Sequence, residues 1–382
     1  MTSADGPRLA GRQLELRPGA ATFFGAGEVA RLPACVAAAG RRRAFVVTDA
    51  GVVASGVVAH VARVLGGAGI EHELHDSIQP NPDTGALEAG AGVLRRFGEA
   101  VVIGLGGGAV LDAAKGISLA AANDVDVREL DYRRGNFLSG LPVIAVPTTA
   151  GTGAETNGFG VIDDPRAKRK FYVGHDSVVP KATILDPLLT IGLPSGPTAA
   201  SGMDALAHAL ESLASRRANP YSHGLCLEVV RTVPIWLPAA VADGQNLEAR
   251  SRMLLAAHLA GLAFSPTGLG LCHAVGHGLS ARLGTPHGIA LAVMLPHVLA
   301  FNQSLCAEID AEVADIMGAE TASLAVASLS AALGLPRTLA ELGCTTELIP
   351  QLVHDALADE VLANTPRKPT SEELTALLQN AL

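Results

Sequence analysis

Hydrophobic positions in the first half of the chain alternate between short continuous runs and longer stretches with helical spacing. The continuous runs, which are typical of buried strands, are residues 44–48, 100–105 and 142–146. The stretches with helical spacing are residues 57–66, 84–96 and 110–121. Because apolar runs joined by helix-length connections are typical of parallel strands with crossovers, the pattern predicts a doubly wound α/β domain.

The second half of the chain has helical spacing almost throughout. The predicted helices span residues 203–213, 220–239, 247–263, 273–282, 322–333 and 371–382. The change falls in a stretch rich in Pro and Gly, residues 186–197. We therefore predict an α/β domain over residues 1–192 and an all-helical domain over residues 193–382, with a ligand in the cleft between them.

The composition excludes several classes of protein. A content of 49% hydrophobic and 17% charged residues rules out a disordered chain. The 28 Lys and Arg against 37 Asp and Glu give a net charge of −9, so we expect no nucleic-acid partner. Residues Met1–Arg17 hold no apolar stretch of signal-peptide length, and apolar stretches elsewhere are broken early, which predicts no membrane span. Five scattered cysteines without a Cys-x-x-Cys pair indicate a soluble protein of a reducing cytoplasm.

A glycine-rich loop, residues 104–109, follows a predicted strand and precedes a predicted helix. Glycines allow the backbone to approach a phosphate closely, and a helix N-terminus offers unpaired N–H groups. The loop is not in the first strand–helix turn, where the usual dinucleotide fingerprint lies. The pattern therefore favours a variant of nucleotide binding, although a tight turn without a ligand has the same sequence features.

Two further polar segments follow predicted strands. Asp49 can bind a ribose 2′-hydroxyl and repel a 2′-phosphate, or it can simply cap the next helix. Residues 147–155, Pro-Thr-Thr-Ala-Gly-Thr-Gly-Ala-Glu, carry hydroxyls and glycines that suit contact with a sugar or a phosphate. The same residues would also suit a solvated connection, so both interpretations stay open.

The helical half contains the most specific chemistry. Asp204 and His208 are four residues apart and share one helical face, as do His273 and His277. His287 follows after a predicted turn. One carboxylate with three imidazoles suits a divalent metal such as Fe²⁺ or Zn²⁺. Four ligands suffice, and the spacing does not say which of the five residues is spare; a spare histidine would carry protons near the substrate.

Taken together, these motifs resemble those of iron-containing (group III) alcohol dehydrogenases. Residues 106–115 are similar to the family's Gly-Gly-Gly-Ser-x-x-Asp-x-Ala-Lys loop, and residues 147–155 to its Pro-Thr-Thr-x-Gly-Thr-Gly-Ser-Glu stretch. Residues 202–211 and 272–288 resemble its metal-binding blocks. Ala109 and Ala154 stand where the family usually has serine, so each removes a hydroxyl from a loop that faces the cofactor.

The resemblance implies the fold shared with dehydroquinate synthase: a nucleotide-binding domain followed by an all-α metal-binding domain. It implies the metal ligands Asp204, His208, His273 and His287. It implies that His277 relays protons near the nicotinamide. The cofactor-binding residues implied by the resemblance are Asp49, Asn81, Gly106, Gly107, Asp112, Thr148, Thr149, Thr152 and Lys170.

The resemblance also implies an activity: NAD(P)-dependent interconversion of a small alcohol and its aldehyde, with Fe²⁺ expected ahead of Zn²⁺. Asp49 occupies the position that discriminates between coenzymes and favours NAD over NADP. The expected partners are a small-molecule alcohol or aldehyde and a second copy of the chain, in a homodimer or a larger homo-oligomer. We expect no nucleic-acid and no membrane partner.

Three other functions remain as alternatives. A reductase of the maleylacetate type does without metal, which the intact Asp204 and three ligand histidines argue against. A lyase of the dehydroquinate-synthase type would bind a phosphorylated substrate through several Lys and Arg, whereas residues 273–297 offer only Arg282. A sensing module would bind metal or nucleotide without turnover.

Overall fold

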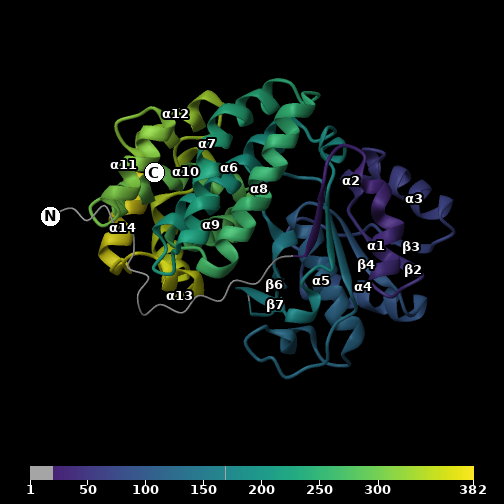
Figure 1. Ribbon diagram of the computed structural model, residues 1–382. Helices are drawn as coiled ribbons and strands as arrows, with labels where there is room; N and C mark the ends of the chain where they lie inside the picture. Colours follow the sequence, from purple (N-terminus) through teal and green to yellow (C-terminus); the bar gives the residue numbers. More distant parts are fainter. Residues whose placement is uncertain (1–19, 168) are drawn as a thin grey trace.

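Two unlike halves lie side by side in the molecule, a mixed α/β half and a helical half (Figure 1). The computed structural model describes residues 20–167 and 169–382, so the segment Met1–Arg17 lies outside the described residues. Strand β8 is the last strand of the α/β half. From Ser195 to the C-terminus, all regular elements are helices. The fold therefore confirms the predicted combination of an α/β part and an all-helical part.

A six-stranded parallel sheet forms the centre of the first half. Its strand order is β1-β8-β5-β4-β2-β3, and every ladder is parallel. The strands are β1 (Ala21–Phe24), β2 (Arg43–Val47), β3 (Glu71–His75), β4 (Val101–Gly106), β5 (Val143–Pro147) and β8 (Ala182–Leu185). The strands β2, β4 and β5 lie inside the sheet and are buried almost completely. Burial on both faces explains why these three appear in the sequence as continuous apolar runs.

Helices cover both faces of this sheet, as the doubly wound prediction requires. They are α1 (Leu32–Ala38), α2 (Ala50–Ala54), α3 (Val57–Gly67), α4 (Thr84–Phe97) and α5 (Gly108–Ala122). Side chains of β2 alternate between the two faces. Phe45 and Val47 pack with residues of α4 and α5, whereas Ala44 and Val46 pack with residues of α1 and α3. This period of two is the signature of a strand between two helical layers.

Several elements of the first half were not predicted from the sequence. They are β1, β3, β8 and a separate antiparallel hairpin, β6 (Phe159–Asp164) and β7 (Arg169–Gly174). The edge strand β1 has four residues and is largely exposed, so it has no continuous apolar run. In β6 buried and half-buried positions alternate, and polar residues Asp163 and Asp164 end the strand. Short or polar strands give a weak sequence signal, and only pairing with a neighbour reveals them.

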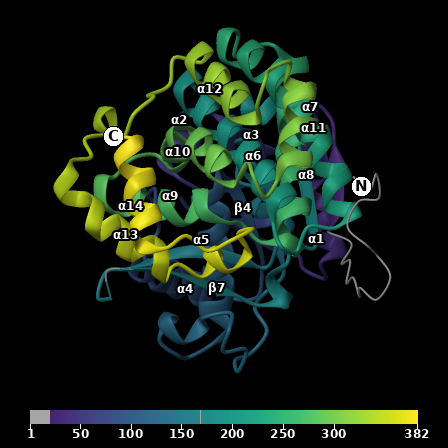
Figure 2. The same ribbon diagram turned by 90° about the vertical axis from the view of Figure 1, so that its left-hand side faces the viewer.

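Nine α-helices make up the second half. They are α6 (Ser195–Ala214), α7 (Pro220–Ala242), α8 (Leu247–Thr267), α9 (Leu271–Leu283), α10 (His287–Asn302), α11 (Ala307–Met317), α12 (Ala322–Ala332), α13 (Ile349–Ala358) and α14 (Ser371–Asn380). Helix α6 is buried along nearly its whole length and packs against α7, α8 and α10. Helices α10, α11 and α13 were not predicted. Viewed from the helical side, α9, α13 and α14 lie next to one another (Figure 2).

One helix corrects the expectation that no apolar stretch reaches membrane-spanning length. By length and composition α7 passes that test, with a mean hydropathy of 1.5 in its most apolar window. Core helices of proteins that contact no membrane pass the same test. Helix α7 packs along α6 and α8, and its residues Val229, Val233 and Leu237 belong to the main core of the helical half.

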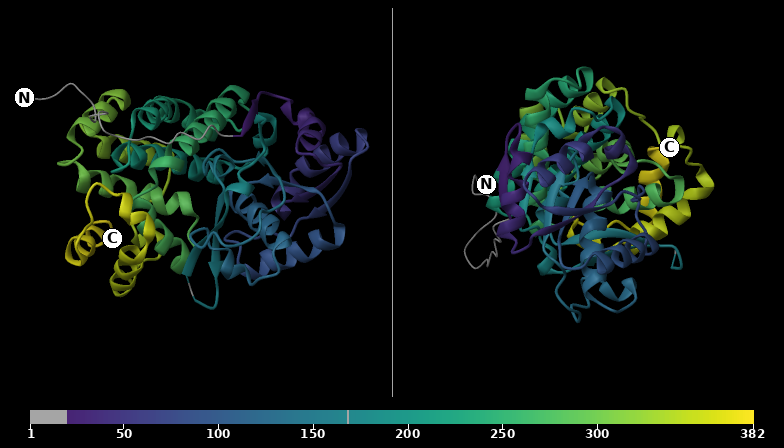
Figure 3. Two further views of the ribbon diagram at one scale, coloured as in Figure 1. Left: turned by 60° about the horizontal axis from the view of Figure 1, so that its bottom comes forward. Right: turned by 90° about the vertical axis from the view of Figure 1, so that its right-hand side faces the viewer.

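The two halves lie against each other (Figure 3), and two glycines lie at backbone contacts between them. A Cβ on Gly151 would lie 2.5 Å from the carbonyl oxygen of Ser201 in α6. Gly153 has a φ of +60°, and a Cβ there would lie 2.5 Å from the Cα of Gly261 in α8. Two glycines of the segment 147–155 are therefore needed for backbone-to-backbone contact between the halves, whether or not a ligand binds nearby.

Candidate metal centre and cofactor-binding edge

The strand order explains why the glycine loop follows β4 rather than the first strand. Strands β2 and β4 are neighbours, but the chain continues from β2 to β3 on one side and from β4 to β5 on the other. Such a topological switch point is where open α/β sheets bind their ligands. Asp49 follows β2 and Gly106 ends β4, so both lie at this point. Thr48 Oγ1 donates to the Leu105 carbonyl at 2.7 Å, and Thr148 N donates to the Gly106 carbonyl at 3.0 Å, which joins the ends of the three strands.

The predicted threonines pack directly on the glycine loop. A Cβ on Gly107 would lie 3.2 Å from Thr149 Cγ2, and one on Gly108 would lie 2.5 Å from Thr152 Cγ2. Gly107 is the N-cap residue of α5, and no side chain caps this helix. The sequence therefore builds an uncapped helix N-terminus beside two hydroxyl groups, a site that suits a phosphate.

Asp112 and Lys115 connect α5 to the hairpin. Asp112 Oδ2 accepts from Val161 N at 3.0 Å, and Lys115 Nζ lies 3.4 Å from Asp112 Oδ1. Lys115 Nζ also donates to the Ala154 carbonyl at 2.8 Å and to Asn157 Oδ1 at 3.1 Å. Burial lowers the pKa of Lys115 and raises that of Asp112. The carboxylate of Asp112 is thus bound within the protein and joins α5 to the hairpin.

Three other predicted cofactor residues also have partners inside the protein. Asp49 Oδ1 accepts from Val52 N at 2.9 Å and caps α2, the structural role that the sequence left open. Lys170 Nζ donates to Asn81 Oδ1 at 3.1 Å and to Asp163 Oδ1 at 2.8 Å. The structure thus links Asn81 and Lys170, which are 89 residues apart in the chain.

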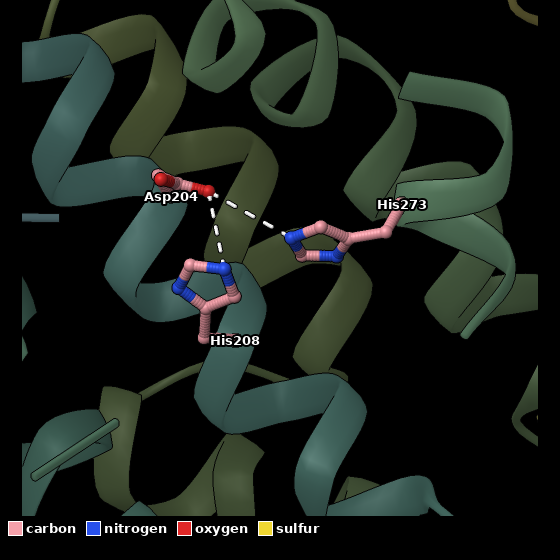
Figure 4. A group of neighbouring side chains, drawn as sticks. All are labelled: Asp204, His208 and His273. Atoms are coloured by element: carbon pink, nitrogen blue, oxygen red, sulfur yellow. Dashed lines mark ion pairs between the residues drawn. The ribbon is translucent and has the colours of Figure 1, made fainter. Parts of the chain in front are cut away.

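The metal candidates of α6 and α9 converge. Asp204 and His208 project from one face of α6, and His273 approaches them from α9 (Figure 4). One ligand atom from each of the three lies within 4.8 Å of the others, and all three residues are buried. Asp204 Oδ1 lies 3.6 Å from His208 Nε2 and 3.8 Å from His273 Nε2, which is too long for hydrogen bonds.

The donor atoms of this group fit a cation. Among the described residues, Asp204 Oδ1 and His273 Nε2 are buried without a hydrogen-bond partner. An orphaned carboxylate oxygen in a buried site is costly unless an ion or a donor satisfies it. A carboxylate oxygen with imidazole nitrogens is also a donor set that divalent transition metals prefer.

Acceptors behind two imidazoles fix their orientation. His208 Nδ1 donates to the Gly151 carbonyl at 3.2 Å, and His273 Nδ1 donates to Glu211 Oε2 at 2.5 Å. Glu211 Oε1 in turn accepts from Cys272 N at 2.6 Å. A partner at Nδ1 leaves Nε2 as the lone-pair nitrogen of a neutral ring, and such partners orient the ligands of metal sites. The bond to Gly151 also ties His208 to the segment 147–155, whose threonines pack on the glycine loop.

Sequence reasoning missed Glu211. It lies three residues after His208 and seven after Asp204, so it shares their helical face. That spacing was available from the sequence, but a third acidic or imidazole group on one face does not by itself indicate which residue it supports.

The pKa values of Asp204, His208 and His273 are shifted in different directions. Burial lowers the pKa of His208 to about 4, although Asp204 opposes the shift. Burial also acts to lower the pKa of His273, but Glu211 and Asp204 outweigh it and raise that pKa to about 9. Burial acts to raise the pKa of Asp204, and His208 and the other imidazoles outweigh it, so its pKa falls below the ordinary range. A metal at this site would displace a proton from His273.

His287 and His277 lie beside this group rather than within it. The His287 ring centroid is 5.3 Å from that of His273, and the His287 ring stacks on His277 at 5.3 Å with an interplanar angle of 16°. Burial holds the pKa of His287 well below its usual value, so the ring is neutral. His277 Nδ1 donates to Asp359 Oδ2 at 2.7 Å, a partner that the sequence did not suggest.

Comparisons with known proteins agree with this architecture. The profile of the family described as iron-containing alcohol dehydrogenase matches residues 19–187, and that of the Fe-containing alcohol dehydrogenase family, C-terminal, matches residues 198–382. An NAD-dependent methanol dehydrogenase from Bacillus methanolicus is 33% identical over 375 residues, covering 95% of this chain and 98% of that protein. A 1,3-propanediol dehydrogenase from Klebsiella pneumoniae is 36% identical over 374 residues, covering 94% and 96%.

A solved structure gives the same result. The crystal structure of a 1,3-propanediol oxidoreductase superposes with a TM-score of 0.93 at 34% identity, covering 97% of this chain and 100% of that one. Profiles that match both halves, and relatives that align end to end, show that the chain belongs to the iron-containing alcohol dehydrogenase family.

Proposed function

We propose that this protein is a metal-dependent, NAD-linked dehydrogenase that interconverts a small alcohol and its aldehyde. The observation that carries the proposal is the buried oxygen of Asp204, which has no hydrogen-bond partner among the described residues and faces Nε2 of His208 and of His273. The Gly151 carbonyl behind His208 belongs to the loop that packs on the predicted cofactor site. The names of the relatives, a methanol dehydrogenase and a 1,3-propanediol dehydrogenase, support a small alcohol as substrate.

The residues proposed to hold the metal are Asp204, His208, His273 and His287. When bound, the metal would supply a Lewis acid that polarises the substrate oxygen and lowers the pKa of an alcohol. Glu211 keeps the His273 ring turned with Nε2 toward Asp204. Burial excludes water from these donors, which strengthens every electrostatic contact among them.

The cofactor is proposed to lie across the switch point. The N-terminus of α5 after Gly107 would bind its pyrophosphate through backbone N–H groups. Thr149 and Thr152 would border it, and Asp49 would bind the ribose hydroxyls and disfavour a 2′-phosphate. Lys170, held by Asn81 and paired with Asp163, would contact the cofactor through its ammonium group. NAD supplies the hydride acceptor when bound, and His277 would accept the substrate proton at Nε2, because its Nδ1 is engaged by Asp359.

We also propose Fe²⁺ as the resident metal, a cytoplasmic location and a homodimer. The family supports iron, and five cysteines that remain unpaired support a reducing compartment. The donor set supports a metal enzyme over a metal-free reductase of the maleylacetate type. A metal-free enzyme would leave the buried Asp204 carboxylate and the two oriented imidazoles without a ligand.

One purification tests the proposal. Metal content is measured on the isolated protein, which is then stripped with a chelator and reloaded with Fe²⁺ or Zn²⁺. NADH release is followed over primary alcohols, diols and hydroxy acids. We expect turnover of a small alcohol that disappears with the metal and returns on reloading. Full turnover in metal-free protein, or metal and NAD binding without turnover across the panel, would contradict the proposal.

A further inference from the structure

Asp359 is the carboxylate that approaches the His277 ring from outside the metal group. It lies between α13 and a 3-10 helix, η8 (Glu360–Asn364). Its Oδ2 lies 2.7 Å from His277 Nδ1, and about one sixth of each side chain is exposed, 16% for Asp359 and 14% for His277. The pair joins α9 to a segment 82 residues further along the chain.

The carboxylate of Asp359 is itself fixed. Its Oδ1 accepts from Val361 N at 3.0 Å and caps η8. On the next residue, Glu360 Oε2 lies 3.3 Å from Arg133 Nη1, which links η8 to the α/β half. With one oxygen bound to the backbone, the other oxygen has a defined direction, toward the imidazole.

We propose that Asp359 is a positioning residue that fixes the tautomer and the orientation of His277; this inference rests on the proton-carrying role of that histidine in the proposed function. An ionised carboxylate only accepts hydrogen bonds, so the His277 proton lies on Nδ1 and the lone pair on Nε2. In alcohol oxidation the substrate O–H bond breaks, a bond from Nε2 to hydrogen forms, and the hydride leaves carbon for NAD⁺. Nε2 can accept that proton only in the tautomer that Asp359 selects.

Asp359→Asn separates this role from a structural one. The Val361 N–H needs an acceptor, so the amide oxygen stays at the cap and the amide NH₂ faces His277 Nδ1. Two donors cannot pair, and the ring proton moves to Nε2. The shape of the residue and the cap of η8 are retained, so fold and cofactor binding are preserved.

Asp355→Asn is the matched control. Asp355 also joins this part of the chain to α9, because its carboxylate accepts from Arg282 Nε at 2.5 Å and from Nη2 at 2.9 Å. It lies four residues before Asp359, and its carboxylate pairs with Arg282, whereas that of Asp359 pairs with His277. Losing it removes a link between α13 and α9 without changing the partner of the imidazole.

The direct test is ¹⁵N NMR of the full-length, metal-free protein labelled at histidine nitrogens, in a buffer alkaline enough for neutral imidazoles. His277→Asn identifies the resonances of His277. We expect the proton on Nδ1 in the wild type and in Asp355→Asn, and on Nε2 in Asp359→Asn. A wild-type His277 protonated at Nε2, or an unchanged tautomer in Asp359→Asn, would overturn the inference. Since no turnover is needed, this result stands apart from the outcome for the proposed function.

Kinetics provide the second test. Asp359→Asn is expected to lower kcat about a hundredfold or more, in the range of a lost general base, while KM for NAD changes by less than about twofold. Asp355→Asn leaves both near wild type. In the His277→Asn background, Asp359→Asn should cost nothing further, because the residue that it positions is gone. Equal losses in both backgrounds would show that Asp359 stabilises structure only, and would overturn the inference.

Discussion

The proposed cofactor-binding edge of the sheet and the proposed metal centre are built in opposite ways. At the edge, the strand ends and the uncapped N-terminus of α5 offer backbone groups, and the side chains there mainly set spacing. At the metal centre, a carboxylate and imidazoles converge, and backbone and acidic groups behind them set orientation. Where backbone groups bind the ligand, a substitution that changes only the polarity of a side chain should alter binding little, whereas one that adds volume should weaken it. Where side chains bind the ligand, both kinds of substitution should weaken binding, because each side chain supplies a donor atom that no other residue replaces.

The two departures from the family's serines lie at the edge and fit this contrast. Ala154 is buried and packs with Leu111 and Ala145, so an apolar contact occupies its surroundings. Ala109 is half-buried in the first turn of α5. Neither change removes a backbone N–H group from the N-terminus of α5, the element proposed to bind the phosphate.

Asp204→Ala should have the largest effect and should separate the two regions. It removes the carboxylate from the metal centre, so metal is no longer retained. Activity should fall more than about a thousandfold, because a Lewis acid contributes several kcal/mol to the barrier. The cofactor-binding edge is unchanged, so NADH affinity should stay within about twofold. Metal analysis checks the loss of metal, and fluorescence titration checks the NADH affinity. A variant that keeps a full complement of metal would refute the prediction.

Gly108→Val is the corresponding change at the edge. A Cβ at this position would lie 2.5 Å from Thr152 Cγ2, so the loop must move away from the helix N-terminus. We expect the Kd for NADH to rise about tenfold, which is about 1.4 kcal/mol, while metal content is unchanged.

Gly66→Ala is the matched control for that change, since Gly66 is also helical but has nothing within 4 Å of a Cβ. It should leave NADH binding unaltered and should stabilise α3 by up to about 1 kcal/mol. Equal NADH affinities for Gly108→Val and Gly66→Ala would show that the glycine loop is a plain turn.

Substitutions of Asp49 test whether a side chain at the edge discriminates between NAD and NADP. Asp49→Ser keeps an oxygen that can cap α2 at Val52 N and removes the charge, so the preference for NAD over NADP should fall about tenfold at unchanged stability. Asp49→Ala should shift preference equally and lose about 1 kcal/mol of folding free energy, because the cap is lost. Kinetics with both coenzymes and thermal unfolding separate the two effects. Unchanged preference in both variants would assign Asp49 to capping alone.

Ala109→Ser should have the smallest effect. It restores the hydroxyl that the family usually carries beside the phosphate site, while backbone N–H groups still make the main contacts. The Kd for NADH should change by less than about twofold, measured by the same titration. A tenfold or greater gain in NADH affinity would show that side-chain hydroxyls make the main contacts at this edge. The edge and the metal centre would then both bind through side chains.

Local patterns were sufficient where one element carries the information. Strands β2, β4 and β5 are buried on both faces, so each appears as an apolar run. The spacing of four between Asp204 and His208 puts both on one face of a helix, whatever surrounds it. Edge strands and the hairpin carry no such pattern, because their identity depends on a partner strand.

The sequence by itself determined the α/β and helical halves, the glycine loop, the carboxylate–imidazole pairs and the family, since each depends on spacing within a short segment. Only the tertiary structure decided that β2 and β4 are neighbours at the switch point, that Glu211 orients His273, and that Asp359 contacts His277. These contacts join segments far apart in the chain. Their geometry follows from packing between elements, for which a local pattern of hydrophobic positions carries no information.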